Sequence, residues 1–183
     1  MINIQLFGGP GTGKSTTAAG LFYEMKTQDY IVEYIQEFAK ELTFSRDYTR
    51  LSDQLLILGE QHHRMKRLEG QIEFLIHDSP FVMGLTYLEN DKHLPKDIYI
   101  DLITTMYNSY NNLNIFLKRS TDLEYQEYGR SQSLEEAKKK DNEILQMLDD
   151  NNIPFIEIEM GKNAVRQILE ELIKGSLLNK VES

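Results

Sequence analysis

The sequence predicts an α/β fold, because strand-like and helix-like segments alternate along the chain. Residues 1–7 alternate apolar and polar side chains, as a β-strand does, and a glycine-rich run follows them directly. Residues 14–26 then carry small and apolar residues at helical spacing. Strands that alternate with helices form βαβ units. We therefore expect a parallel sheet with helices on both of its faces.

The later strands are indicated by short apolar runs that are bounded by polar or turn residues. Residues 30–36 are typical, because they read Tyr-Ile-Val-Glu-Tyr-Ile-Gln and are followed by Glu37. The same pattern predicts strands over residues 72–76, 113–117 and 153–158.

The helices are indicated by apolar residues at helical spacing. The longest covers residues 51–68, and Gly70 ends it. Its predicted apolar face consists of Leu51, Leu55, Leu58, His62 and Met65. A capping box, Ser133-Leu134-Glu135-Glu136, starts another helix. The remaining helical segments are residues 38–44, 95–110 and 163–174.

Length and composition predict a single domain over residues 1–175, with a short tail over residues 176–183. The chain has no cysteine, which excludes disulfides, thiolate metal sites and cysteine nucleophiles. We find no signal-like segment and no apolar run of membrane-spanning length, so we expect a cytoplasmic protein without a membrane partner. The net charge of -9 disfavours nucleic acid as a partner, although a local basic cleft can coexist with an acidic exterior.

The glycine-rich run is a phosphate-binding motif. It fits G-x-x-x-x-G-K-[ST], with a predicted strand before it and a predicted helix after it. Its backbone N–H groups and the positive end of the helix dipole can surround phosphate oxygens, while Lys14 adds a charge and the Ser15 hydroxyl is a ligand for Mg²⁺. The structural alternative is a loop that only joins a strand to a helix. The residues predicted to bind ATP are Gly8, Gly9, Pro10, Gly11, Thr12, Gly13, Lys14 and Ser15.

Two carboxylates end predicted strands, at the edge where the sites of parallel sheets assemble. Asp78 stands where P-loop proteins hold the acidic residue for Mg²⁺. An Asx turn or a helix N-cap is its structural alternative. Glu37 can take a proton from an attacking hydroxyl or hold a water of Mg²⁺. Its structural alternative is a surface glutamate at the start of a helix.

Four arginines are candidates for contacts with anionic groups. Arg119 and Arg130 flank a polar and aromatic segment, which we expect to form a lid over about residues 120–132. Arg119 is assigned to the nucleotide site, and Arg130 to the neutralisation of charge on the transferring phosphoryl group. Arg64 and Arg67 lie one helical turn apart and can form an anion pocket for the acceptor. Exposed loop or helix positions are the alternative for all four.

The order of these motifs resembles one branch of small P-loop kinases. The resemblance covers about residues 1–174, and the branch includes the ribosylnicotinamide kinase domain of a bifunctional regulator of NAD biosynthesis. It also includes phage-type kinases, some of which act on 5-hydroxymethyluracil in DNA. The matching segments are Phe7 to Thr16, Glu37-Phe38-Ala39-Lys40, Asp78-Ser79-Pro80 and Tyr128-Gly129-Arg130.

The resemblance implies a three-layer P-loop NTPase fold, whose five-stranded parallel sheet has the order 2-3-1-4-5. It also implies a lid after the fourth strand and an adenine-binding loop after the fifth. Thr16 would then belong to the nucleotide site, and Met160, Gly161 and Asn163 would border adenine. ATP and Mg²⁺ are the implied cofactors.

Together these features predict an ATP-dependent kinase that transfers the γ-phosphate to a hydroxyl of a nucleoside-like acceptor. Lys14, Glu37, Asp78 and Arg130 are the predicted catalytic residues. The acceptor is either a free nucleoside or nucleotide, or a 5-hydroxymethyl pyrimidine base that can be part of DNA. A hydroxyl is favoured over a phosphate, because the expected lid is poor in arginine and an alcohol benefits from a carboxylate base.

Other functions stay open at this point. The first alternative is a nucleoside monophosphate kinase. The others are an NTP-hydrolysing regulatory switch without an acceptor and, less favoured by the net charge, a nucleic-acid-dependent ATPase. The sequence is compatible with a monomer and with a homodimer.

Overall fold

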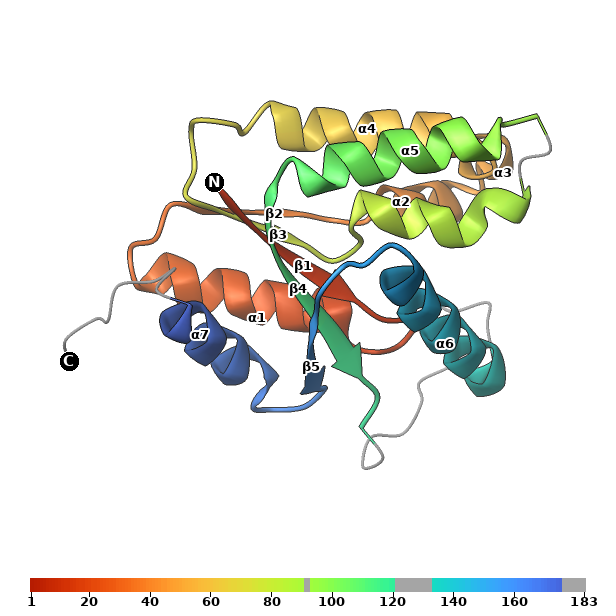
Figure 1. Ribbon diagram of the computed structural model, residues 1–183. Helices are drawn as coiled ribbons and strands as arrows, with labels where there is room; N and C mark the ends of the chain where they lie inside the picture. The colour runs from red at the N-terminus through yellow and green to blue at the C-terminus, as the bar shows by residue number, and fades with distance from the viewer. Residues whose placement is uncertain (91–92, 121–132, 176–183) are drawn as a thin grey trace.

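The structure is a computed structural model, and it describes residues 1–90, 93–120 and 133–175. Its centre is a sheet of five parallel strands in the order β2-β3-β1-β4-β5 (Figure 1). The predicted fold class and strand order are therefore confirmed. The strands are β1 (Ile2–Phe7), β2 (Val32–Ile35), β3 (Phe74–His77), β4 (Asn111–Lys118) and β5 (Ile156–Glu159).

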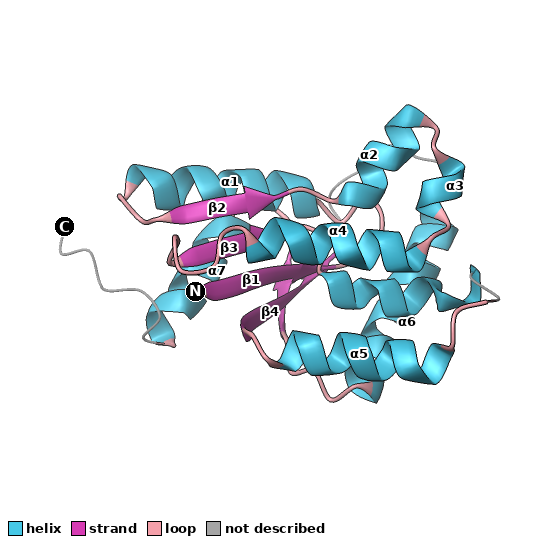
Figure 2. Cartoon of the chain, turned by 90° about the horizontal axis from the view of Figure 1, so that it is seen from above, coloured by secondary structure: helices cyan, strands magenta, loops and turns pink. Residues whose placement is uncertain are grey.

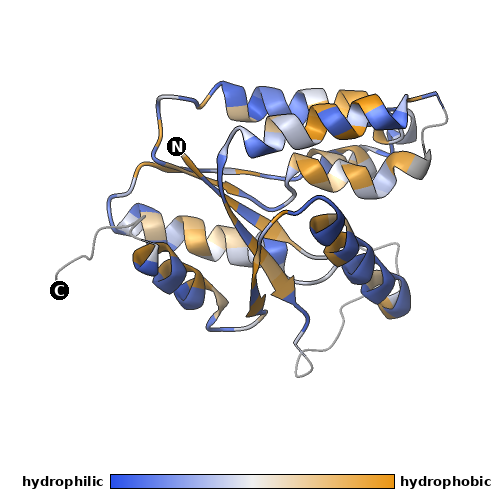
Figure 3. Ribbon diagram, in the orientation of Figure 1, coloured by the Kyte–Doolittle hydropathy of each residue, from blue (hydrophilic) through white to orange (hydrophobic). Residues whose placement is uncertain are grey.

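Helices cover both faces of the sheet, as Figures 1 and 2 show. The helices α1 (Lys14–Thr27) and α7 (Ala164–Lys174) pack on one face around Ile4, Leu6 and Ile115. The other face is covered around Phe7, Leu75 and Phe116. Its layer consists of α4 (Gln54–Lys66), the 3₁₀ helix η1 (Phe81–Asn90), α5 (Lys96–Asn108) and α6 (Leu134–Asp150). Apolar residues of the strands lie between the layers, whereas α6 and α7 carry many hydrophilic residues (Figure 3).

The segment between β2 and β3 is predicted to hold a helix over residues 38–44 and a long helix over residues 51–68. The first is confirmed as α2 (Phe38–Ser45). The second is wrong in its start, because α3 (Tyr48–Leu51) is a separate helix and α4 begins only at Gln54. The Asp53 side chain accepts a hydrogen bond from the Leu56 N–H at 3.0 Å and starts α4 there, as an N-cap does.

The predicted apolar face of this helix is partly wrong. Leu55 is 53% exposed, and the buried residues are Gln54, Ile57, Leu58, Gln61 and Met65. Gln61 is buried with a polar partner, because its side-chain amide donates to the Ser79 carbonyl. At Gln54 it is the backbone carbonyl that accepts the Tyr99 hydroxyl. At Gln61 a polar partner thus overrides the hydrophobic pattern.

Two further features concern the helices and how far the sequence predicts them. The capping box of α6 is confirmed, because the Ser133 hydroxyl accepts from the Glu136 N–H and the Glu136 carboxylate accepts from the Ser133 N–H. The 3₁₀ helix η1 is an element that the sequence analysis does not predict.

Some expectations fall outside the described residues. These are most of the expected lid with Arg130, and the tail over residues 176–183. Among the helices that the structure describes, we find none long and apolar enough to cross a membrane.

A row of buried polar side chains lies on the face of the sheet that α4 and α5 cover. It includes Asn3, Gln5, His77 and Asn114. His77 stands beside Gln5 in the parallel register of β3 and β1. Its Nε2 atom has no hydrogen-bond partner among the described residues. Burial lowers the pKa of His77 to about 3, so the imidazole is neutral in the folded protein at neutral pH.

This histidine predicts how stability depends on pH. The unfolded chain takes up the His77 proton near pH 6.5, whereas the folded chain does so only near pH 3, so stability is lost as pH falls between these values. We expect His77→Leu to flatten the dependence of the unfolding free energy on pH, by about 1.4 kcal/mol per pH unit at most. Urea unfolding from pH 7 to pH 4 measures this, with the exposed His63→Leu as control. Equal slopes for His77→Leu and the wild type would contradict the assignment.

Candidate active site

Residues 8–15 form the loop between β1 and α1, at the carboxyl edge of the sheet. Three glycines have the positive φ angles that glycine tolerates best, 139° at Gly8, 82° at Gly11 and 76° at Gly13. Gly13 directly precedes α1, so the loop opens onto the positive end of that helix. The geometry is that of an anion-binding loop at a helix N-terminus.

Lys14 is the cation of this loop. Its Nζ donates to the carbonyl oxygens of Gly8 at 2.6 Å and Gly9 at 3.0 Å. Burial lowers the pKa of Lys14, while the carboxylates of Glu37, Asp78 and Asp141 act in the opposite direction. The structure therefore brings Lys14 together with both predicted acidic residues and with Asp141, which the sequence analysis does not predict.

Asp78 follows β3 and is 2% exposed. Its Oδ2 atom accepts a hydrogen bond from the Tyr34 hydroxyl at 2.6 Å. A hydrogen bond from Ser15 also reaches the Tyr34 side chain and opposes the rise in the pKa of Tyr34 that burial and Asp78 cause. Tyr34 thus links the two residues that we predict to be Mg²⁺ ligands.

The residues at this point fit a magnesium ion. The Asp78 Oδ1 atom is buried and has no hydrogen-bond partner among the described residues. Mg²⁺ is usually held by one or two carboxylates together with water and substrate phosphates. No group of three or more acidic or histidine residues that could hold a metal exists within the described ranges. An ion held by Ser15 and Asp78 would therefore depend on phosphate and water for its other ligands.

Glu37 lies between β2 and α2 and is half-buried. It occupies the N-cap position of α2, but its side chain makes no capping hydrogen bond. Burial raises its pKa, the charge of Lys14 opposes this rise, and the charge of Asp78 adds to it. The helix start therefore does not use the carboxylate, which stays basic and close to Lys14.

Arg119 directly follows β4, and its guanidinium contacts both α6 and the loop of residues 8–15. Its Nε donates to Asp141 Oδ2 at 2.5 Å, and its Nη2 donates to the Pro10 carbonyl at 2.6 Å. Asp141, on α6, also accepts the Gly9 N–H at 2.6 Å. Asp141 is not predicted as a site residue, because it follows the lysine run of residues 138–140, which has the pattern of a solvated helix face.

The predicted pair Arg64 and Arg67 is not brought together at the loop. Arg64 forms a bidentate ion pair with Glu41 of α2 and a second ion pair with Glu60. Its guanidinium lies 5.0 Å from the centre of the ring of Phe38, the residue that follows Glu37 in the chain. Arg67 is exposed just after α4, where the chain returns to the opposite edge of the sheet to start β3.

The residues predicted to border adenine lie after β5. Met160 packs against the loop so closely that a Cβ atom on Gly13 would lie 2.6 Å from its Cε. Gly161 has open space around it, and Asn163 makes no side-chain capping bond at the start of α7. Thr16 is exposed in the first turn of α1. These positions are compatible with the prediction but do not test it.

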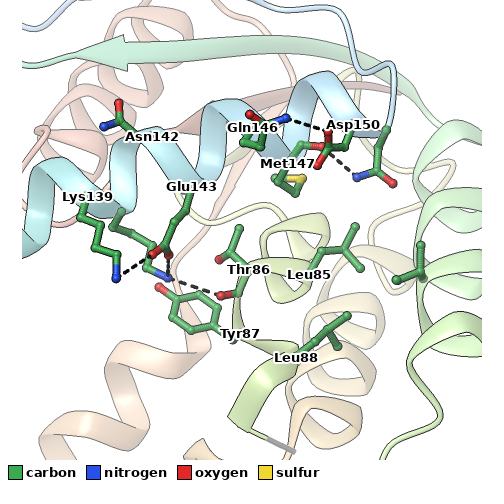
Figure 4. Close-up of a pocket in the computed structure, with 13 residues that line it drawn as sticks. Leu85, Thr86, Tyr87, Leu88, Lys139, Asn142, Glu143, Gln146, Met147 and Asp150 are labelled. Carbon is green, nitrogen blue, oxygen red and sulfur yellow. Dashed lines mark hydrogen bonds and ion pairs between the residues drawn. The ribbon is translucent and has the colours of Figure 1, made fainter.

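A pocket of about 1000 Å³ lies between η1 and α6. In Figure 4, Glu143 of α6 faces Tyr87 of η1 across it. Its lining, within the described part of the chain, contains none of the loop residues. Tyr87 lines this pocket, and burial and then the charges of Glu37 and Glu143 raise the pKa of Tyr87 to about 12.

Comparisons with known proteins agree with the fold. A family model described as AAA domain matches residues 3–166. A structure of deoxyadenosine kinase from M. mycoides with bound dCTP shares 18% identity at a TM-score of 0.62, over 94% of this chain and 99% of that chain. A structure of the same enzyme with the products dCMP and dCDP shares 22% identity at a TM-score of 0.56, over the same shares of both chains. No curated protein matches this chain.

The hydrogen bond between Tyr34 and Asp78 yields a prediction about magnesium. In Tyr34→Phe the Asp78 carboxylate loses the partner that orients it, so we expect Mg²⁺ to support ATP binding about tenfold less well. Titration of Mg²⁺ against a fluorescent ATP analogue measures this, and binding of the analogue in EDTA should be unchanged. Tyr23→Phe, which alters an exposed tyrosine of α1, is the matched control. A Tyr34→Phe titration that overlays the wild type would show that the contact does not support a metal site.

Proposed function

This chain belongs to the AAA domain family, and from that premise we propose that it is an ATP-dependent kinase of a nucleoside-like acceptor. The observation that carries the proposal is Glu37, a basic carboxylate that is not used as a helix cap and lies close to Lys14 and Asp78. A phosphate acceptor, which is already an anion at neutral pH, has no need for such a group. A hydroxyl acceptor does need one, because its proton must leave.

The loop provides the donor side of the proposed reaction. The backbone N–H groups of residues 11–15 and the start of α1 receive the β- and γ-phosphates. Lys14 exchanges the carbonyl oxygens of Gly8 and Gly9 for phosphate oxygens. Ser15 and Asp78 would hold Mg²⁺, which when bound neutralises the charge on the phosphate groups.

Glu37 provides the acceptor side. As the acceptor oxygen attacks the γ-phosphorus, the new O–P bond forms and the bond between that phosphorus and the bridging oxygen of ADP breaks. The hydroxyl proton passes to the Glu37 carboxylate. Burial and the charge of Asp78 make this carboxylate more basic than an exposed glutamate, while Lys14 keeps it from being protonated too readily. The site is therefore suited to an alcohol more than to a phosphate acceptor.

The proposed acceptor class is a nucleoside, a nucleotide or a 5-hydroxymethyl pyrimidine base. The deoxyadenosine kinase structures support the nucleoside class, because they share the fold. The pocket between η1 and α6 provides space beside Tyr87, whose pKa the charge of Glu37 helps to raise. The net charge of -9 favours a small acceptor over DNA.

Incubation with γ-labelled ATP and a panel of acceptors tests the proposal. The panel contains deoxynucleosides, nucleoside monophosphates, ribosylnicotinamide and DNA with 5-hydroxymethyluracil. We expect label on a hydroxyl of one class. Label on a phosphate of a monophosphate would favour the monophosphate kinase, and release of inorganic phosphate with no labelled acceptor would favour the hydrolytic switch.

The role of Glu37 makes a separate prediction. Glu37→Gln should lower kcat by about 10²-fold or more, with near-normal ATP affinity, because the variant lacks the proton acceptor. Since the pKa of Glu37 is raised, the wild-type kcat should fall on the acid side at a pH above the ordinary carboxyl value of 4.5. That limb should be absent in Glu37→Gln. Steady-state kinetics from pH 5 to pH 8 provide both readouts.

The exposed Glu24→Gln, on α1, is the matched control and should retain its turnover and its acid limb. Wild-type turnover in Glu37→Gln would exclude Glu37 as the base.

A further inference from the structure

We infer that Asp141 and Arg119 are a positioning pair, which holds Gly9 and Pro10 of the P-loop against α6 in the shape that receives the triphosphate. The pair acts through the loop and does not contact the nucleotide. This inference rests on the nucleotide-binding part of the proposed function and on no particular acceptor.

The contacts form a closed network between three elements. Asp141 Oδ1 accepts the Gly9 N–H at 2.6 Å, and its Oδ2 accepts Arg119 Nε at 2.5 Å. Arg119 Nη2 donates to the Pro10 carbonyl at 2.6 Å and lies 3.4 Å from Asp141 Oδ1. Two consecutive residues of the loop are thus bound through their backbones, one by a donor and one by an acceptor. Such contacts fix the path of the chain whatever the loop side chains are.

The glycine at position 9 supports the inference independently. Unlike Gly8, Gly11 and Gly13, Gly9 does not have a positive φ, so its backbone does not require glycine. A Cβ atom there would lie 2.6 Å from Asp141 Oδ1 and 2.8 Å from the Ala137 carbonyl oxygen. Helix α6 therefore approaches the loop as closely as a residue without a side chain allows. The need for glycine at this position comes from the contact with α6.

The electrostatics explain why the pair works as a unit. The Arg119 and Asp141 side chains are only 15% and 13% exposed. Removal of one partner leaves the other as an uncompensated, poorly solvated charge. Asp141 and Arg119 also shift the pKa of Lys14 in opposite directions, so together they add little net charge beside the lysine. The pair can thus hold the loop without repelling the triphosphate.

This arrangement changes the role expected for Arg119. The sequence analysis assigns it to direct contact with the nucleotide. In the structure its guanidinium is turned to Asp141 and to the back of the loop. A direct ligand of the γ-phosphate would favour ATP over ADP, whereas a residue that shapes the loop affects both nucleotides alike.

A double-mutant cycle on nucleotide binding tests the inference. The proteins are the wild type, Asp141→Ala, Arg119→Ala and the double variant, and calorimetry gives the Kd of each for ATP and for ADP with Mg²⁺. We expect each single variant to bind both nucleotides about tenfold more weakly, and the double variant to be within about twofold of the weaker single variant. Lys118→Ala, which removes an exposed ion pair beside Arg119, should bind like the wild type.

The inference would be overturned if Asp141→Ala bound ATP and ADP within about twofold of the wild type. It would also be overturned if the affinity losses of the two single variants added in the double variant. A loss of affinity in Arg119→Ala for ATP but not for ADP would be a third contradictory result. If Asp141→Ala does not fold, Asp141→Asn serves instead. The amide oxygen of the asparagine can accept the Gly9 N–H, but the neutral side chain cannot form an ion pair with Arg119. Wild-type affinity of Asp141→Asn for the nucleotides would therefore also contradict the inference. A wild type that binds no nucleotide would instead refute the proposed function, so the two failures are distinguishable.

Discussion

The candidate site depends on one constraint, which is that the charge of Lys14 lies in a poorly solvated position at the carboxyl edge of the sheet. Its ammonium is bound by two carbonyl oxygens of its own loop. The three carboxylates that favour its charge come from separate elements, because Glu37 follows β2, Asp78 follows β3 and Asp141 lies on α6. The strand order places the ends of β2 and β3 on the same side of β1, and α6 closes the other side. The parallel topology is thus what assembles the charges.

Helix α6 connects the two sides of this site through consecutive residues. Asp141 binds the loop on the donor side. Lys140 reaches η1 at the pocket, where its Nζ donates to the Thr86 carbonyl and lies 4.4 Å from the centre of the Tyr87 ring. A displacement of the first turns of α6 would therefore change both the loop and the pocket that we assign to the acceptor. Such a connection lets one rigid helix set the distance between donor and acceptor, on which group transfer depends.

The sequence predicts the parts of this site that depend on local chemistry. Sequence patterns are enough to predict the glycine motif with Ser15, and the ends of predicted strands are enough to predict Glu37 and Asp78. Tyr34, Tyr87 and Asp141 are not, since their roles come from contacts between residues far apart in the chain. Gln61 shows the same limit in the core, where the Ser79 carbonyl is the polar partner of a side chain that periodicity places outside. Arg64 and Arg67 share a helical spacing, but Glu41 and Glu60 bind Arg64, whereas Arg67 is exposed just after the end of α4, and the spacing does not indicate this difference.

The central claim is that Lys14 is held at the sheet edge in order to receive the phosphates of ATP. Its most direct test is the Kd of ATP with Mg²⁺ for the wild type and Lys14→Met, measured by calorimetry on proteins whose melting curves show that both are folded. The account predicts a loss of affinity of at least about tenfold, or about 1.4 kcal/mol, in the variant. Equal affinity in the two proteins would contradict it.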